Sequence, residues 1–210
     1  MSPAPVPAAT VYSDARARIL AAAQRLFAES GYDSTSISRV AQSAGVSKAN
    51  IFHHFSSKQD LYLEVLHESR SHLENLFDDL KLSGDLTQRL ARFLDRHLTS
   101  IYEREAGFRL LLHEMLTGEQ HEAIAKRVGG DNFRRLVANL RAAQQQGDVR
   151  TGVDPAVVAF VLVAASAFFY LSRPVLRHTP EAEFADRPDH YVQQVADLIT
   201  FGLRSVEERS

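Results

Sequence analysis

The sequence predicts an all-α protein in which an N-terminal three-helix domain with a helix-turn-helix precedes a larger helical bundle, about nine helices in all. Three observations support this prediction. Apolar residues recur at helical spacing along the chain, and no alternating polar and apolar run is long enough for a strand. No repeat appears at periods of about 20 to 50 residues. A chain of 210 residues, 45% of them hydrophobic, can also bury a sizeable core.

The first predicted helix begins near Ser13 or Asp14 and ends at Gly31. Its apolar face consists of Ile19, Ala22, Ala23, Leu26 and Phe27. Residues 1–12 are rich in proline and alanine, and they lack the basic start and the long apolar run of a secretory signal. We therefore expect a disordered tail over 1–12 and a cytoplasmic protein.

Two short amphipathic helices follow, over residues 37–44 and 49–54, and a turn containing Gly45 separates them. Ser47 can cap the second of them. Two short helices joined by a glycine-containing turn form a helix-turn-helix. We therefore assign the DNA-binding domain to residues 13–56.

The rest of the chain, 57–210, is assigned to a second domain. Ser57 and Asp60 are spaced as a capping box for a long helix that leaves the first domain. That helix carries Tyr62, Val65, Leu66, Ser69, Leu73, Leu76, Phe77 and Leu80 on its apolar positions. Further helices are expected over 86–104, 108–116, 119–146, 154–176 and about 190–206.

Residues 155–172 contain no charge and reach the lower length limit of a membrane-spanning helix. However, Asp154 as a cap and Pro155 at the first helical position are typical of a soluble helix. Small residues in this segment permit close helix packing. A helix that is apolar on all sides can be buried against its own domain and a symmetry mate together, so we expect no membrane contact.

Several classes of enzyme site are missing from the sequence. Cysteine is absent, which excludes disulfides, thiolate metal sites and a cysteine nucleophile. The single ExxH of residues 64–67 lacks the second motif that a di-iron bundle needs. The adjacent His53 and His54 would point about 100° apart on a helix and could not chelate one metal ion. We expect neither enzyme activity nor a cofactor, with a helical metal or cofactor enzyme as a distant alternative.

Residues 45–55, GVSKANIFHHF, carry no carboxylate, although the chain has 24 basic and 26 acidic side chains. In residues 1–60 the balance is reversed, with six basic and four acidic side chains. An ordinary capped surface helix could have this composition. A helix that lies against the phosphates of DNA would also avoid carboxylates, because they would be repelled.

The side chains of this peptide suit a recognition helix in the major groove. Its first residues would reach base edges, while hydroxyls and lysines would hold phosphates. Ser47 and Lys48 suit phosphates or a guanine edge, and His53 suits a phosphate. Ala49 suits a thymine methyl, and Asn50 can pair with adenine in a bidentate manner.

Residues 19–66, ILAAAQRLFAESGYDSTSISRVAQSAGVSKANIFHHFSSKQDLYLEVL, resemble the DNA-binding domain of TetR-family transcriptional regulators almost position by position. The match covers about a quarter of the chain. By position, the resemblance implies that DNA is contacted by Thr35, Ser36, Ser47, Lys48, Ala49, Asn50, Phe52, His53 and Lys58. The family's usual tyrosines are replaced by Phe52 and His53, so Phe52 lacks a hydroxyl for phosphate.

For the second domain, the resemblance implies dimerisation through the last two long helices and an apolar effector pocket. Candidate pocket residues are Phe93, His97, Ile101, Phe108, Leu112, Met115, Phe133, Val137, Phe168 and Tyr170. Candidate interface residues are Val157, Val161, Ala165, Val195, Leu198, Ile199 and Gly202. For any single pocket residue, filling a bundle core is the simpler explanation.

The sequence thus predicts a homodimeric, ligand-responsive DNA-binding regulator. We expect a repressor that binds a palindromic operator and is released by a small, largely apolar effector. The resemblance carries this mechanism, and the residues are consistent with it. An effector-independent DNA-binding or partner-recruiting factor is the alternative.

Overall fold

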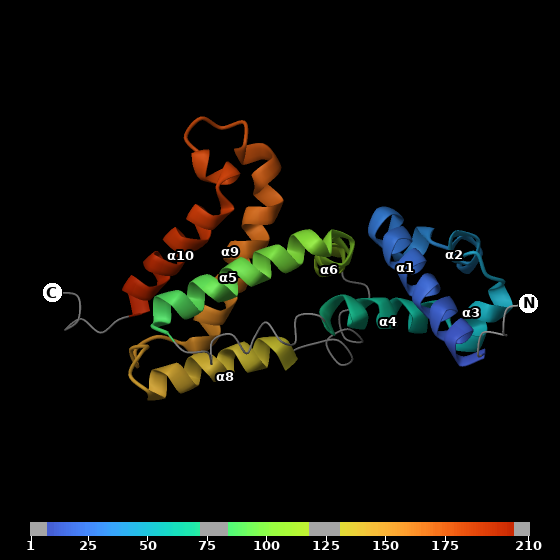
Figure 1. Cartoon of the computed structure of the whole chain (residues 1–210), viewed down its shortest axis with the longest axis horizontal. Coiled ribbons are helices and arrows are strands. Elements are labelled where there is room, and N and C mark those ends of the chain that lie inside the picture. The colour runs from blue at the N-terminus through green and yellow to red at the C-terminus, as the bar shows by residue number, and fades with distance from the viewer. Residues whose placement is uncertain (1–7, 72–83, 118–130, 204–210) are drawn as a thin grey trace, which may run out of the picture. The chain divides into compact units, whose positions relative to one another are not determined.

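The computed structural model describes residues 8–71, 84–117 and 131–203 (Figure 1). Within these ranges it contains nine α-helices, one 3-10 helix and no strand. The all-α prediction is therefore confirmed for the described part of the chain. The chain divides into two compact units, which are described separately.

The first unit comprises residues 1–71 and 104–129. Its helices are α1 (Ala8–Ser34), α2 (Ile37–Ala44), α3 (Lys48–His54), α4 (Lys58–Ser71) and α6 (Glu105–Thr117). The second unit comprises residues 72–103 and 130–210. Its elements are α5 (Leu86–Glu103), α8 (Asp131–Gln145), α9 (Pro155–Leu176), η2 (Glu183–Asp186) and α10 (Pro188–Leu203). The first unit thus contains the predicted domain of residues 13–56 together with α4 and α6.

Helix α1 is longer than the sequence predicts. It begins at Ala8, so the predicted tail over 1–12 is corrected for its last five residues. The alanines that follow Pro7 favour the helix, because alanine has the highest helix propensity. At the other end, Gly31 interrupts the helix with φ 77° and ψ 171°, which confirms the predicted stop.

The turn between α2 and α3 depends on Gly45, which adopts a left-handed conformation with φ 65° and ψ 41°. Its amide donates to the carbonyl oxygen of Gln42 at 3.3 Å, and the amide of Val46 donates to that of Ala41 at 3.0 Å. These bonds satisfy carbonyls at the end of α2 in a Schellman-type arrangement. Because the turn is so tight, α3 begins only four residues after α2 ends.

The predicted capping box of α4 forms with one difference. The Ser57 hydroxyl accepts a hydrogen bond from the amide of Asp60 at 3.0 Å. In return, the Asp60 carboxylate accepts from the amide of Ser56 at 3.1 Å rather than from that of Ser57. The helix therefore begins at the predicted place. Its predicted continuation through Leu73, Leu76, Phe77 and Leu80 lies outside the described residues.

The core of the first unit includes one helix that follows much later in the sequence. Side chains of α1, α2, α3 and α4 pack together around Phe27, Ile51 and Tyr62, none of which is exposed to solvent. Leu110 of α6 completes this cluster and is also fully buried. A Cβ atom at Gly107 would come within 2.8 Å of Gln24 and 3.0 Å of Ser69. A side chain at residue 107 would therefore require the Gln24 and Ser69 side chains to move, so Gly107 suits this close approach of α6.

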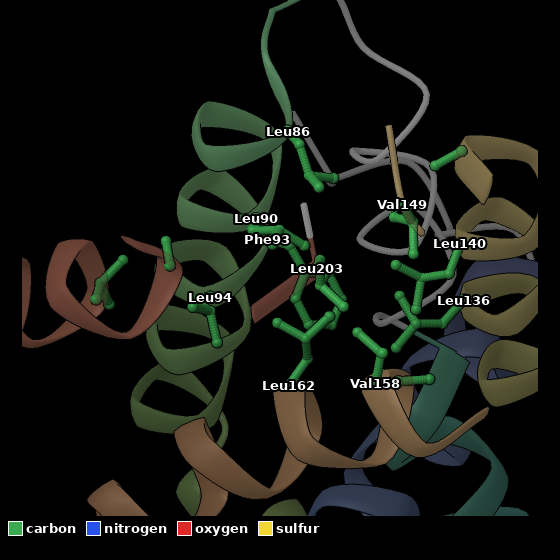
Figure 2. Packing of buried hydrophobic residues seen from close by; sticks show 14 of the residues in the cluster. Leu86, Leu90, Phe93, Leu94, Leu136, Leu140, Val149, Val158, Leu162 and Leu203 are labelled. Atoms are coloured by element: carbon green, nitrogen blue, oxygen red, sulfur yellow. The ribbon is translucent and has the colours of Figure 1, made fainter. Parts of the chain in front are cut away.

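The second unit has its own core (Figure 2). Helix α5 packs against α9 and α10, and α8 packs against α9. The cluster contains Leu86, Leu90, Phe93, Leu94, Leu98, Leu136, Leu140, Ala143, Val149, Val158, Ala159, Leu162, Phe169, Val192, Ala196 and Leu203. A stack of Tyr191 on Phe169, with ring centroids 4.2 Å apart, extends it toward the C-terminal end of α9.

Helix α9 starts as predicted, because the Asp154 side chain accepts from the amide of Ala156 at 2.8 Å and Pro155 occupies the first turn. Among the described helices, α9 is the one long and apolar enough to cross a membrane, with mean hydropathy 2.1. The same features occur in core helices of soluble proteins.

Helix α10 carries apolar residues on two sides. Val192, Ala196, Thr200 and Leu203 are buried, whereas Leu198 and Gly202 are exposed. Periodicity alone therefore does not decide which side faces the core.

Candidate DNA-binding interface and effector unit

Helix α3 separates its packing residues from its exposed ones. Ile51 is fully buried, and Phe55, which follows the helix, is 3% exposed. Four other residues are exposed: Lys48, Ala49, Phe52 and His53. At 100° per residue these four fall on one side of the helix, away from Ile51. The structure therefore brings four of the predicted DNA contacts together on one surface, with no carboxylate among them.

Two serine hydroxyls cap the helices at this surface. The Ser47 hydroxyl accepts from the amide of Asn50 at 3.1 Å, and the Ser36 hydroxyl accepts from the amide of Arg39 at 3.2 Å. Both serines are exposed. Since each hydroxyl uses only an acceptor site in the cap, its hydrogen can still be donated to a phosphate. Both predicted contacts thus have a suitable geometry.

The predicted contact at Thr35 is corrected. Its side chain is 1% exposed, and its hydroxyl donates to the carbonyl oxygens of Gly31 at 2.9 Å and Leu26 at 3.1 Å. The kink at Gly31 leaves carbonyls near the end of α1 in need of a donor, and Thr35 provides it. Its hydroxyl is therefore used inside the unit and cannot reach a phosphate.

Asn50 is only partly exposed, and its amide oxygen Oδ1 is buried without a hydrogen-bond partner. A buried polar atom without a partner costs free energy, so this side chain has a reason to change its conformation on binding. A bidentate contact with adenine requires the amide group to turn outward. The structure places Asn50 beside the exposed face of α3 rather than at its centre.

The two histidines at the end of α3 have different environments. Their ring centroids lie 5.2 Å apart in an edge-to-face arrangement. His53 is exposed, whereas His54 is half-buried. Burial lowers the pKa of His54, and the neighbouring His53 and Arg16 lower it further. His54 therefore contributes little positive charge to the interface at neutral pH, and His53 is the one placed to meet a phosphate.

Lys58, at the first turn of α4, completes the predicted set of DNA contacts. Its ammonium Nζ lies 4.1 Å from the ring centroid of Tyr32 and donates to the carbonyl oxygen of Asp33 at 3.4 Å. A lysine over an aromatic face is held by a cation–π interaction. Here that interaction fixes a cation at the amino end of a helix, where anions bind favourably.

One exposed cation near this surface was not predicted. Arg39 of α2 is exposed, and its guanidinium donates to the Ser30 hydroxyl at 3.1 Å. Its position follows from the sequence, because Val40 and Ala41 face the core and the preceding residue must face outward.

The candidate pocket residues are distributed over both units. Phe108, Leu112 and Met115 belong to α6 in the first unit, and Met115 is 73% exposed. In the second unit the buried candidates are Phe93, His97 and Ile101, and the partly buried ones are Val137 and Tyr170. Phe133 is 36% exposed and Phe168 is 71% exposed. Phe168 therefore points out of the unit rather than into its interior.

His97 is the most unusual of the buried candidates. Its ring stacks on Phe93 with centroids 5.7 Å apart, and its Nδ1 atom is buried without a hydrogen-bond partner. Burial lowers the pKa of His97 to about 4. The imidazole is therefore neutral near pH 7, as a histidine in an apolar environment should be.

Exposed apolar residues form a stripe along α9. It consists of Val157, Phe160, Val161, Phe168, Leu171 and Val175. Their spacing of three, four and seven residues places them on one side of the helix. On α10, Leu198 is 72% exposed and Phe201 is 62% exposed. We refer to these eight residues as the α9/α10 stripe.

The predicted interface residues coincide with this stripe in part. Val157, Val161 and Leu198 belong to it, and Gly202 is exposed beside it. Ala165, Val195 and Ile199 instead pack against the core of their own unit. The stripe also contains the exposed aromatic residues Phe160, Phe168 and Phe201, which the predicted set does not include.

Comparison with known proteins gives three consistent results. Residues 19–65 match the model of a family described as "Bacterial regulatory proteins, tetR family". The transcriptional activator FasR of Mycolicibacterium smegmatis is 32% identical over 166 residues, which cover 76% of this chain and 74% of FasR. The transcriptional repressor AcnR of Corynebacterium jeikeium is 36% identical over 75 residues, covering 36% of this chain and 40% of AcnR.

Solved structures agree with the fold over most of the chain. PfmR of Thermus thermophilus, a TetR-family regulator, has 26% identity and a TM-score of 0.67, covering 90% of this chain and 96% of PfmR. FadR of Bacillus subtilis, solved in complex with stearoyl-CoA, has 19% identity and a TM-score of 0.70, covering 90% of this chain and 99% of FadR. The FadR likeness concerns the fold alone.

The neutral state of His97 predicts a loss of stability in acid. As the pH falls from about 6.5 toward about 4, the unfolded chain takes up a proton that folded His97 does not, so the free energy of unfolding falls by up to about 3 kcal/mol. His97→Leu should remove that part of the pH dependence. The measurement is denaturant unfolding at a series of pH values, with the exposed His178→Leu as control. An unchanged pH dependence in His97→Leu would contradict the assignment.

Proposed function

Because the chain belongs to the tetR family of bacterial regulatory proteins, we propose that it binds a palindromic operator as a homodimer and leaves it when an effector binds. It is a DNA-binding transcriptional regulator. The observation that carries the proposal is the exposed, carboxylate-free face of α3, which is held by a capped helix-turn-helix.

The proposed contacts with DNA follow from the exposed groups. Lys48, Ala49 and His53 would enter the major groove together with Phe52, and Asn50 would turn outward toward a base. The hydroxyls of the two capping serines and the ammonium of Lys58 would meet phosphates on either side. Two such faces about 34 Å apart would match successive major grooves on one side of the duplex.

The proposed dimer uses the α9/α10 stripe. Phe160, Phe168 and Phe201 are exposed to water in a single protomer. Contact between water and so large an apolar area is unfavourable. A second copy would cover the stripe with the same residues, since a twofold interface pairs each patch with itself. This interface also explains why α9 is apolar around its whole circumference without a membrane.

The proposed effector is a small, largely apolar molecule bound in the second unit. Phe93 and Ile101 supply buried apolar surface there, and His97 supplies a neutral polar group without a partner. The stearoyl-CoA bound by FadR makes long-chain acyl compounds the first to test. Effector binding would favour a dimer whose two α3 helices no longer match successive grooves.

Repression is the proposed output. Of the named relatives, AcnR is a repressor, whereas FasR is an activator, so a reporter gene under the operator decides the sign. We propose no catalytic role and a cytoplasmic location, in keeping with relatives that are named as transcriptional regulators.

Selection of binding sites from random duplex DNA tests the DNA-binding proposal. We expect a palindrome with two half-sites. Lys48→Ala should weaken binding to all duplexes and make its salt dependence shallower, by about 0.9 in slope per lost phosphate contact. Asn50→Ala should relax the preference at one base pair of each half-site by about 1 to 3 kcal/mol. Wild-type affinity and salt slope in both variants would refute the assignment of α3.

Phe168→Glu tests the dimer. A charge in the middle of the stripe would be buried without a partner, so we expect the dimer dissociation constant to rise at least about 100-fold. Analytical ultracentrifugation measures it. The control is Ala138→Glu on the exposed side of α8, which should leave the dimer intact. A Phe168→Glu protein that remains a dimer at low concentration would place the interface elsewhere.

Stearoyl-CoA tests the effector class. At about 100 times its dissociation constant, a ligand of the folded state stabilises it by about 2.7 kcal/mol, which appears as a higher melting temperature. The same ligand should weaken binding to the selected duplex. Acetyl-CoA and stearate distinguish recognition of the headgroup from recognition of the chain. If no acyl compound changes either measurement, the effector belongs to another class.

A further inference from the structure

A continuous set of contacts joins the phosphate-binding end of α4 to the interior of the first unit. The Lys58 ammonium lies over the Tyr32 ring at 4.1 Å. The Tyr32 ring lies against that of Tyr62, with centroids 4.8 Å apart. The Tyr62 hydroxyl donates to the Glu114 carboxylate of α6 at 2.5 Å. Three contacts therefore link the Lys58 ammonium, which is proposed to meet a phosphate, to the Glu114 carboxylate on a segment distant in sequence.

This carboxylate is buried, since Glu114 is 6% exposed and Tyr62 is fully buried. Burial raises the pKa of the Tyr62 phenol, and the hydrogen bond to Glu114 raises it further. The phenol therefore keeps its proton and remains a donor throughout the physiological pH range. A phenylalanine at 62 facing an apolar residue at 114 could fill the same space without burying a charge. Packing alone does not require the polar pair, but the polar pair fixes the direction of the Tyr62 hydroxyl.

The packing of helix α6 holds the Glu114 carboxylate at the Tyr62 hydroxyl. Gly107 allows it to approach α1 and α4 closely, where Gln24 donates to the Ser69 hydroxyl at 2.9 Å. One turn before Glu114, Leu110 is buried in the core of the unit. Beside Glu114, the His113 ring would lie 3.4 Å from a Cβ atom at Gly31. The helix thus contacts both Tyr62 and the chain segment that leads to Tyr32.

We propose that Glu114 and Tyr62 are positioning residues for DNA binding, which set the place of the Lys58 ammonium through the Tyr32 ring. The inference rests on the proposed function, because it assumes that Lys58 meets a phosphate. Neither Glu114 nor Tyr62 touches DNA. Their contribution is that Lys58 is already held in place before the duplex arrives, so less side-chain freedom is lost on binding.

A double-mutant cycle tests the inference, with the selected duplex as probe. Lys58→Ala alone should weaken binding up to about eightfold near 0.1 M salt, the loss of one phosphate contact, with a shallower salt slope. Tyr62→Phe alone should weaken it by about twofold to eightfold with the same change of slope. In the Lys58→Ala background, Tyr62→Phe should cause no further loss, because the residue that it positions is gone.

A second variant covers the case in which Tyr62→Phe does not fold, since it removes the Tyr62 donor from a buried carboxylate. Tyr62→Phe combined with Glu114→Leu replaces the polar pair by an apolar one and should fold while showing the same weaker binding. Matched controls are Tyr102→Phe and Glu105→Gln, both at exposed positions. They should leave affinity and salt slope unchanged.

Two results would overturn the inference and leave the proposed function intact. One is an equal loss from Tyr62→Phe with and without Lys58, which indicates a general effect on the unit. The other is wild-type binding by the folded apolar-pair variant. If the wild-type protein binds no duplex above its non-specific affinity, the proposed function fails, and the inference fails with it.

Discussion

The seven residues of α3 cannot form a stable helix alone, and the rest of the first unit compensates for this. Ile51 and Phe55 anchor the helix in the core, the Ser47 hydroxyl caps its start, and the left-handed Gly45 delivers the chain to it. Because these groups supply the stability, the exposed side of α3 has no packing role. Its side chains are therefore available to bases and phosphates.

The dependence of α3 on a stable core also explains why α6 belongs to the first unit. A small helical domain buries a limited apolar area, and each additional packed helix adds to it. Leu110 and the close approach at Gly107 show that α6 makes this contribution directly. The helix also brings a buried carboxylate to the Tyr62 hydroxyl, so the added stability comes with a defined direction of one polar group. The packing of α6 in the first unit and the proposed placement of Lys58 therefore depend on the same helix.

The sequence predicts local features well where a single residue type has one plausible role. The caps at Ser47 and Asp154 and the stop at Gly31 follow from spacing and chemistry, and the structure has them. Thr35 was harder, because a hydroxyl at a helix start can serve the helix, a phosphate or a buried carbonyl equally well. Which of these it serves depends on the kink at Gly31, and the geometry of that kink is three-dimensional information.

The faces of the last two helices could not be predicted for a different reason. When apolar residues surround a helix, no direction is favoured by periodicity, and only the neighbouring helices decide which side is inside. Phe168 and Phe169 illustrate this, since adjacent identical residues are 71% and 2% exposed. The proposed DNA-contacting side of α3 was easier to predict, because the resemblance assigns it position by position and the sequence around it carries no carboxylate.

The order of synthesis on the ribosome gives the discontinuity of the first unit a further consequence. Its α1 to α4 emerge early, but α6 emerges only after α5, which belongs to the other unit. Until then the Tyr62 hydroxyl has no carboxylate, and the surface that Leu110 covers is open to water. A nascent chain therefore cannot complete its DNA-reading half before it has begun the other half. A fragment cut after α4 would remain in that unfinished state.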